Sequence, residues 1–277
     1  MPTAYVHLPH QVTYRREAFI RGFARLGFSV NECQPARPLE PDEVAVVWNK
    51  TGRSKQTVDM AKIGRGALIV AENGYRGRDS DGRQAYAMAL DGHCGSGRWF
   101  APEGDDSRLK RLQIDFQPFR PGEGKKLLIA GQRGIGSEAM RSPPNWAETL
   151  PHRSNLRGYT CNIRPHPGLH KDAAEPLLEQ LEGVHSLLVW SSNCATEALI
   201  AGYPVYYDAP TIVTAGAAWP LRQFPHESFT EEARQAAFQR LSWAQWFVSE
   251  IESGEAARVL LDVHLGKLKS CNQGFGK

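Results

Sequence analysis

Short apolar runs alternate with amphipathic segments along most of the chain. In the first quarter of the sequence the apolar runs predict four strands, at 4–8, 28–30, 44–48 and 68–71. Helical spacing occurs at 13–26, where Gly27 follows as a stop signal, and near 55–63. This alternation predicts a parallel sheet flanked by helices. We expect the fourth strand to end at Glu72, and the residues 76–98, rich in Gly, Asp and Arg, to form an irregular loop.

The same alternation begins again near residue 125. Further apolar runs predict strands at 127–130, 160–163, 187–190 and 204–207. Helices are expected at 176–181 and after Asn193, and the tail 231–261 has a strongly helical pattern. We therefore expect an α/β protein with two Rossmann-like parallel-sheet halves that face a cleft. The first half would be residues 1–120 and the second 121–277, with the terminal helix packing back on the first half.

The stretch 188–208 combines a fold signal with a chemical one. Its sequence LVWSSNCATEALIAGYPVYYD predicts a strand, a polar turn, a helix stopped at Gly202, and a second strand, which is one βαβ unit. Ser191, Ser192 and Asn193 lie where the strand gives way to the helix. Free backbone N–H groups and the helix dipole favour a phosphate at such a place. The same residue types also serve as simple helix caps.

Three other predicted strand ends carry polar or glycine residues. In open parallel sheets, ligands bind beyond the carboxyl ends of the strands. The three segments are Glu72-Asn73-Gly74, Gly131-Gln132-Arg133-Gly134 and Arg164-Pro165-His166-Pro167. A histidine held between two prolines beside an arginine suits a phosphate or nucleotide. A glutamate at a strand end could act as general base on an acceptor hydroxyl.

Two common nucleotide-binding signatures are missing from the sequence. The run GQRGIG at 131–136 does not match GxGxxG, and no GxxxxGK[ST] occurs. These absences disfavour a nicotinamide-dependent enzyme and a P-loop ATPase.

Composition adds few constraints. The 277 residues are 41% apolar and 23% charged with a formal net charge of +3, which is ordinary for a globular protein. No apolar run is long enough for a membrane span and no secretory signal is visible, so a cytoplasmic location is expected, in a host cytoplasm if the protein is phage-encoded. Five scattered cysteines without paired spacing predict neither disulfides nor a zinc site.

The ordered set ENGY, GQR, RPHP and WSSNCATEALIAGYPV resembles glycosyltransferases of the GT-B architecture, bacterial capsule and polysialic-acid-type enzymes above all. The resemblance implies that Glu72-Asn73-Gly74 is the acidic motif that supplies the base. It implies that His166-Pro167 and the serine motif, Ser191 and Ser192, bind the donor phosphate and stabilise the leaving group. Asn73 departs from the second acidic position of the family, so the base would be Glu72 alone.

These observations predict an inverting transfer of a sugar from a nucleotide-sugar to an acceptor hydroxyl. No metal ion and no other cofactor are expected, because no DxD motif is present and Asp105-Asp106 is expected to be a solvated turn. The catalytic residues would be Glu72 and His166. The expected donor site comprises Gln132, Arg133, Arg164, His166, Ser191, Ser192, Asn193 and Glu197. The expected acceptor site comprises Asn73, Tyr75, Arg76, Arg78 and His93.

The acceptor stays open between a glycan and DNA. The segment 76–98 is rich in arginine and resembles phage-encoded proteins of similar layout, so the alternative is a phage transferase that acts on a 5-hydroxymethylpyrimidine in DNA. Its arginines could instead pair with acidic neighbours in an ordered lid. A third alternative is a nucleotide-sugar epimerase or a nucleotide-binding module. The sequence does not predict the oligomeric state.

Overall fold

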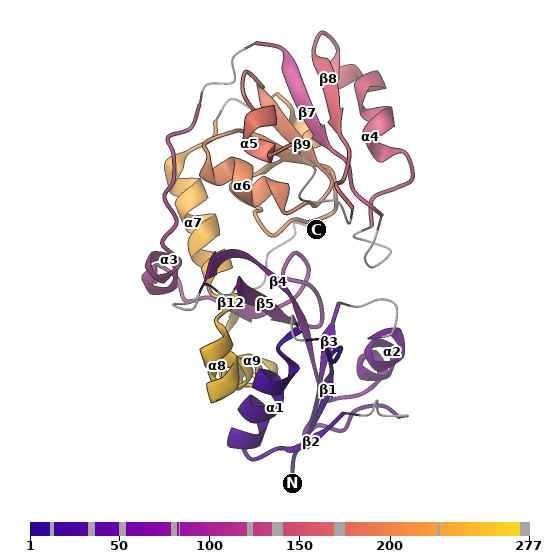
Figure 1. Ribbon diagram of the computed structural model, residues 1–277, viewed down its shortest axis with the longest axis vertical. Coiled ribbons are helices and arrows are strands. Elements are labelled where there is room, and N and C mark those ends of the chain that lie inside the picture. The colour runs from indigo at the N-terminus through magenta and orange to yellow at the C-terminus, as the bar shows by residue number, and fades with distance from the viewer. Residues whose placement is uncertain are drawn as a thin grey trace. The chain divides into compact units, whose positions relative to one another are not determined.

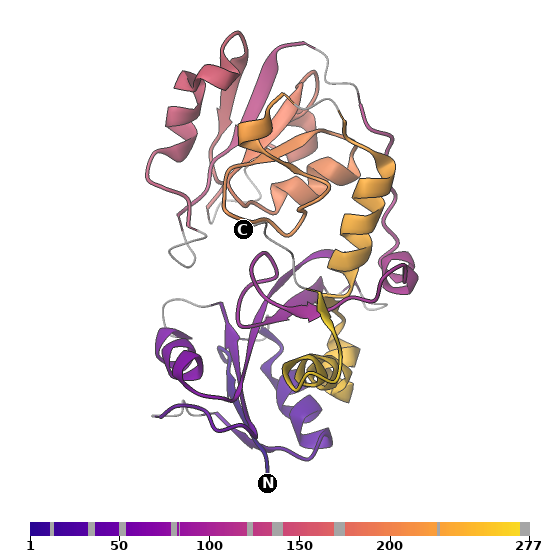
Figure 2. The same ribbon diagram turned by 180° about the vertical axis from the view of Figure 1, so that it is seen from behind.

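The structure is a computed structural model that describes residues 1–11, 14–32, 37–49, 54–78, 82, 84–120, 124–134, 141–168, 175–225 and 228–271 (Figures 1 and 2). The chain divides into two compact units. The first comprises residues 1–113 and 239–277, and the second comprises residues 114–238. No helix in the described ranges is both long and apolar enough to cross a membrane.

The first unit contains a six-stranded sheet of order β12-β5-β4-β3-β1-β2. Its strands are β1 (Thr3–His7), β2 (Ser29–Asn31), β3 (Glu43–Trp48), β4 (Ala67–Arg78), β5 (Gln84–Leu90) and β12 (Gln245–Trp246). Strands β2, β1, β3 and β4 are parallel, whereas β5 and β12 are antiparallel to their neighbours. The centre of the sheet is fully buried, because Val44 to Val47 on β3 have no exposed surface. Such a continuous apolar run is typical of a strand covered on both faces.

Helices cover both faces of this sheet. Helices α1 (Arg16–Arg25), α8 (Val248–Ser253) and α9 (Glu255–His264) lie on one face, and α2 (Lys55–Ile63) lies on the other (Figures 1 and 2). A Cβ atom on Gly22 of α1 would lie 2.1 Å from the carbonyl oxygen of Ile251, so only glycine allows α1 and α8 to pack this closely. The unit also contains α3 (Ser107–Arg111) and a two-stranded ladder of β6 (Trp99–Phe100) with β13 (Ser270–Cys271).

The second unit contains a five-stranded, all-parallel sheet of order β11-β10-β9-β7-β8. Its strands are β7 (Lys126–Ala130), β8 (Thr160–Arg164), β9 (Ser186–Val189), β10 (Val205–Tyr207) and β11 (Trp219–Pro220). Helices α4 (Trp146–Thr149), α5 (Leu177–Gln180) and α6 (Cys194–Ile200) belong to this unit, and α7 (Glu231–Ser242) begins in it. A core cluster of apolar residues, among them Leu127, Trp146 and Leu188, packs beside the sheet.

The predicted fold class is confirmed as a mixed α/β protein with largely parallel sheets. Strands and helices appear close to the expected positions in both halves of the sequence. Residue 13, at the predicted start of the first helix, lies outside the described residues, and so do residues 135 and 136 of the GQRGIG run.

Three of the local predictions differ from the structure. Strand β4 does not end at Glu72 but continues to Arg78, and β5 occupies much of the segment expected to be an irregular loop. The apolar run 85–90 forms this strand, and the polar composition of the preceding residues obscured it. The helical tail is also interrupted, because β12 separates α7 from α8.

Candidate functional site

Glu72 lies just beyond the last parallel pair of β3 and β4, which joins Trp48 to Ala71. From Glu72 onward β4 continues only as a ribbon with β5, where Glu72 pairs with Ala87. The Glu72 carboxylate is partly exposed, and its Oε1 accepts two hydrogen bonds. The Tyr75 hydroxyl donates to it at 2.8 Å and the backbone N–H of Cys94 donates at 3.2 Å. Glu72 therefore lies at the expected edge of the sheet, although not at a strand end.

The environment of Glu72 keeps its two neighbours protonated. Burial, together with the negative charge of Glu72, raises the pKa of the Tyr75 hydroxyl well above its usual value. The same two causes raise the pKa of the Cys94 thiol. Tyr75 is therefore a hydrogen-bond donor at every pH at which the protein would be assayed.

A tight turn over residues 91–98 brings His93 to the same edge. The ring Nε2 of His93 lies 3.1 Å from the side-chain oxygen of Asn49, the residue after β3. His93 directly precedes Cys94, whose N–H contacts Glu72. The structure therefore brings Glu72, Tyr75 and His93 together. Asn49 could not be identified from the sequence, because its contact with His93 depends on the pairing of β3 with β4.

The other predicted acceptor residues do not contact Glu72 through any described hydrogen bond. Side chains alternate along a strand, so Asn73 points to the face opposite Glu72. The exposed Arg78 donates from Nη1 to the carbonyl oxygen of Gly82 at 2.7 Å. The backbone N–H of Arg76 donates to the Gln245 side chain at 2.7 Å, and the Arg76 side chain is exposed. The backbones of β4 and β5 approach closely at Gly74, where a Cβ would lie 2.3 Å from the carbonyl oxygen of Ala85.

In the second unit, the ends of β7, β8 and β9 come together. The backbone N–H of Gly131 donates to the carbonyl oxygen of Arg164 at 2.8 Å, which ties the loop after β7 to the end of β8. The Gln132 side chain then accepts a hydrogen bond from the backbone N–H of Ser191 at 2.7 Å, which ties the same loop to the end of β9. Three predicted donor-site segments therefore share one edge of the sheet, as parallel topology requires.

The serine motif lies directly before α6, whose N-cap residue is Asn193. The hydroxyl oxygen of Ser192 accepts from the backbone N–H of Cys194 at 3.3 Å, whereas the exposed Asn193 side chain makes no capping hydrogen bond. Helix α6 has seven residues, so its dipole is short and side chains must supply most of any anion binding. Glu197 is exposed in its first turn.

Arg164 and His166 follow β8 directly. Nη2 of Arg164 donates to the carbonyl oxygen of Glu175 at 3.0 Å, while its Nε is buried without a hydrogen-bond partner in the described part of the chain. Nδ1 of His166 accepts from the backbone N–H of Gly168 at 2.9 Å, so a neutral His166 ring carries its proton on Nε2. Arg133 is exposed after β7. The edge is thus rich in donors, as an anionic ligand requires.

A carboxylate that the sequence did not bring to attention lies at the end of the neighbouring strand. Asp208 follows β10 and accepts hydrogen bonds from Trp146 Nε1 at 2.7 Å and from both terminal nitrogens of Arg153, at 3.0 and 2.5 Å. Its position directly after an apolar run was the signal that could have identified it. Because its oxygens are engaged, Asp208 anchors the segment that precedes β8.

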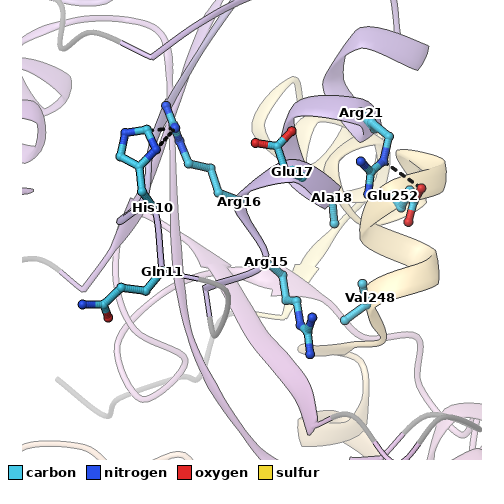
Figure 3. Close-up of a pocket in the computed structure, with 9 residues that line it drawn as sticks. All are labelled: His10, Gln11, Arg15, Arg16, Glu17, Ala18, Arg21, Val248 and Glu252. Atoms are coloured by element: carbon cyan, nitrogen blue, oxygen red, sulfur yellow. Dashed lines mark hydrogen bonds and ion pairs between the residues drawn. The ribbon is translucent and has the colours of Figure 1, made fainter.

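A hollow of about 240 Å³ in the first unit does not include any of the predicted site residues (Figure 3). It is lined by His10, Gln11, Arg15, Arg16, Glu17, Ala18, Arg21, Val248 and Glu252. Nη1 of Arg16 lies 2.7 Å from Nδ1 of His10, and Arg16 also pairs with Glu32. Arg21 pairs with Glu252 at 2.8 Å. Two of its three arginines are therefore already neutralised by carboxylates.

Among the residues that the structure describes, no group of three or more His, Cys, Asp and Glu side chains is arranged to hold a metal ion.

Comparisons with known proteins support the fold. No family model matches the sequence, and no curated protein matches it. Among solved structures, the chain is similar to the KpsC beta Kdo 2,7 transferase of Thermosulfurimonas dismutans, with a TM-score of 0.55 and 14% identity over 86% of this chain and 90% of that chain. It is also similar to the KpsC beta Kdo 2,4 transferase of the same organism, with a TM-score of 0.53 and 13% identity over 87% and 90%. At this identity the likeness establishes a shared fold.

Proposed function

We propose that this chain is a glycosyltransferase that moves a sugar from a nucleotide-sugar donor to an acceptor hydroxyl, with inversion and without a metal ion. The observation that carries the proposal is the strand-end group of the second unit, where Gln132 and Ser191 are joined next to Arg164. The fold shared with two Kdo transferases supports the same reaction class. In this proposal the second unit binds the donor and the first unit binds the acceptor.

The donor residues have separable tasks. Arg164 and Arg133 would neutralise the phosphate of the nucleotide, and Nε2 of His166 would donate a hydrogen bond to the leaving oxygen. Ser191, Ser192 and Asn193 would contact the same phosphate through hydroxyl, amide and backbone groups. Glu197, exposed one turn into α6, would accept hydrogen bonds from the nucleoside hydroxyls. Since the two guanidinium groups and the other hydrogen-bond donors would stabilise the developing negative charge on the leaving group, this arrangement requires no metal ion.

Glu72 would be the base. Inversion requires a proton acceptor on the face of the sugar opposite the leaving group. A partly exposed carboxylate held at the edge of a parallel sheet suits that task. His93, Arg76 and Arg78 would make up the acceptor side. Tyr75 donates to the base itself, and Asn73 points to the opposite face of the strand.

Kdo is the first donor sugar to test, because both similar structures are Kdo transferases. Kdo carries a carboxylate, and the arginines of the strand-end group could bind it in addition to the phosphate. Other nucleotide-sugars belong in the same screen, since likeness of fold alone does not select a sugar.

Thermal unfolding in the presence of nucleotides and nucleotide-sugars tests the donor site. A ligand at one hundred times its Kd stabilises the native state by about 2.7 kcal/mol. We expect selective stabilisation by one class of nucleotide, its loss in His166→Ala, and its retention in His152→Ala, an exposed histidine of the same unit. Equal stabilisation of the two variants would refute the role of His166. If no nucleotide stabilises the wild-type protein, the donor-site proposal is wrong.

DNA is the second candidate acceptor, and the exposed Arg76 and Arg78 favour it. The neighbouring Arg98 is less suited to a phosphate, because it already pairs with Asp91 at 2.6 and 2.9 Å. Phosphate contacts make binding strongly dependent on salt. A shift of duplex DNA at low salt that disappears at high salt would support this candidate, and no shift at low salt would eliminate it.

Release of a free epimerised sugar nucleotide instead of a glycoside would point to the epimerase.

A further inference from the structure

Two donors from different parts of the chain hold the same oxygen of Glu72. Tyr75 lies three residues further along β4, and its hydroxyl reaches Oε1 at 2.8 Å. The backbone N–H of Cys94 reaches the same oxygen at 3.2 Å from the turn after β5. A carboxylate held by two donors on one oxygen has a fixed plane, so its second oxygen, Oε2, also has a fixed direction.

The turn that supplies the Cys94 N–H is itself tightly closed. The carbonyl oxygen of His93 accepts from the backbone N–H groups of Ser96 at 2.8 Å and Gly97 at 2.6 Å. A Cβ on Gly97 would lie 2.6 Å from the carbonyl oxygen of Gly92, so only glycine allows the closure. The contact of His93 with Asn49 ties the turn to the end of β3. The Cys94 N–H is therefore aimed by a rigid element.

We propose that Tyr75 and the turn 91–98 are positioning elements for the base, which fix Oε1 of Glu72 and leave Oε2 to receive the proton of the acceptor. This inference rests on the proposed function. In the step, the acceptor O–H bond breaks and its proton passes to Oε2. The acceptor oxygen forms the new bond to the anomeric carbon, and the bond from that carbon to the phosphate oxygen breaks with its electron pair on the phosphate.

The properties of Tyr75 fit this role. A positioning donor must keep its proton while it faces a carboxylate, and burial raises the pKa of Tyr75 well above its usual value. The Cys94 thiol likewise stays neutral beside the carboxylate, because burial raises its pKa. No second negative charge therefore competes with Glu72 from these two residues.

Tyr75→Phe tests the inference, with Tyr5→Phe as the matched control. Tyr5 donates to the Glu43 carboxylate at 3.1 Å in the same unit, so both variants remove one tyrosine–carboxylate hydrogen bond. We expect Tyr75→Phe to lower kcat about tenfold, the range of one hydrogen bond to a charged group, with the KM for the donor unchanged. Tyr5→Phe should leave kcat unchanged. Equal kcat values in the two variants would overturn the inference.

A double-mutant cycle separates positioning from general structural support. Glu72→Asp keeps a carboxylate but withdraws it by one methylene from both donors. If Tyr75 acts through Glu72, Tyr75→Phe should cost less than twofold in the Glu72→Asp background. A penalty of the same size in both backgrounds would contradict positioning. Should Tyr75→Phe fail to fold, Gly97→Ala takes its place in the cycle, since it displaces the Cys94 N–H by opening the turn.

Glu72→Gln distinguishes failure of this inference from failure of the proposed function. Its amide oxygen can still accept from Tyr75 and Cys94, but it cannot take a proton. If Glu72→Gln has the kcat of wild type, Glu72 is not the base and the proposed function loses this part of its mechanism. If kcat is lost in Glu72→Gln but unchanged in Tyr75→Phe, Glu72 remains the base and only the positioning role of Tyr75 is overturned.

Discussion

Glu250 is the centre of a buried ionic network in the first unit. Its side chain is 5% exposed and accepts from both terminal nitrogens of Arg108 at 3.1 Å, from Arg111 at 2.5 Å and from the backbone N–H of Phe247 at 2.7 Å. Arg108 is itself 10% exposed, and its guanidinium lies 4.2 Å from the ring centre of Trp246. Glu250→Ala therefore leaves a buried guanidinium without its counter-charge.

The expected cost follows from that geometry. Removing one partner of a buried ion pair costs about 3–5 kcal/mol, because the remaining charge stays desolvated. Glu252 provides the matched control, since it lies on the same helix, α8, and pairs with Arg21 while 34% exposed. Removing one partner of an exposed pair costs about 0–1 kcal/mol. Glu250→Ala should therefore be about 3 kcal/mol less stable than Glu252→Ala.

Urea unfolding followed by tryptophan fluorescence measures the difference. Urea is preferred because it does not screen charges. With a slope of about 2 kcal/mol/M, the transition of the first unit should move about 1.5 M lower in Glu250→Ala than in Glu252→Ala, at unchanged slope. Midpoints that agree within about 0.5 M would refute the assignment of Glu250 as the ionic centre of the unit.

Three further predictions concern pH, backbone strain and donor binding. Hydrogen bonds from Arg37 lower the pKa of Glu43 to about 2 from 4.5, so the pair stabilises the fold above pH 4.5 and this contribution is lost as the pH falls toward 2. Urea unfolding should show that the advantage of wild type over Glu43→Gln shrinks between pH 6 and pH 3. Gly202 has φ +83°, and a Cβ there would lie 2.1 Å from a backbone carbonyl oxygen, so Gly202→Ala should lower the free energy of unfolding by at least about 2 kcal/mol. Gly183 has φ +66° with open space around it, so Gly183→Ala should lower it by about 1 kcal/mol. Gln132→Ala leaves the Ser191 N–H without its partner and should weaken nucleotide binding about tenfold, as measured in a titration. An unchanged affinity would mean that the nucleotide binds elsewhere.

The parallel strands were predictable because each is a short continuous apolar run. Val44 to Val47 and Leu127 to Ala130 are buried on both faces of their strands. A strand covered on both faces has no alternation of polar and apolar residues, so the continuous apolar run itself predicts it. The extension of β4 past Glu72 could not be predicted in the same way. The strand was expected to end at Glu72, just before Gly74, whereas the missing side chain of Gly74 allows the backbone of β5 to approach.

The candidate site was predictable as a set of strand ends but not as a set of contacts. Gln132 and Ser191 lie 59 positions apart in sequence, and their hydrogen bond depends on the order β9-β7-β8. The contact of Cys94 with Glu72 depends on β5, which the sequence did not reveal. Local patterns identify which residues follow a strand, and long-range pairing decides which of them meet.

The most direct test of the proposed function is a transfer assay with nucleotide-activated Kdo and other nucleotide-sugars, in which wild type is compared with Glu72→Gln. We expect wild type to release nucleotide and to form a glycoside whose anomeric configuration, measured by NMR, is opposite to that of the donor. Glu72→Gln should bind the donor as wild type does and lower kcat by at least about a hundredfold. A glycoside formed by Glu72→Gln at the wild-type rate, or one with retained configuration, would contradict the proposed mechanism.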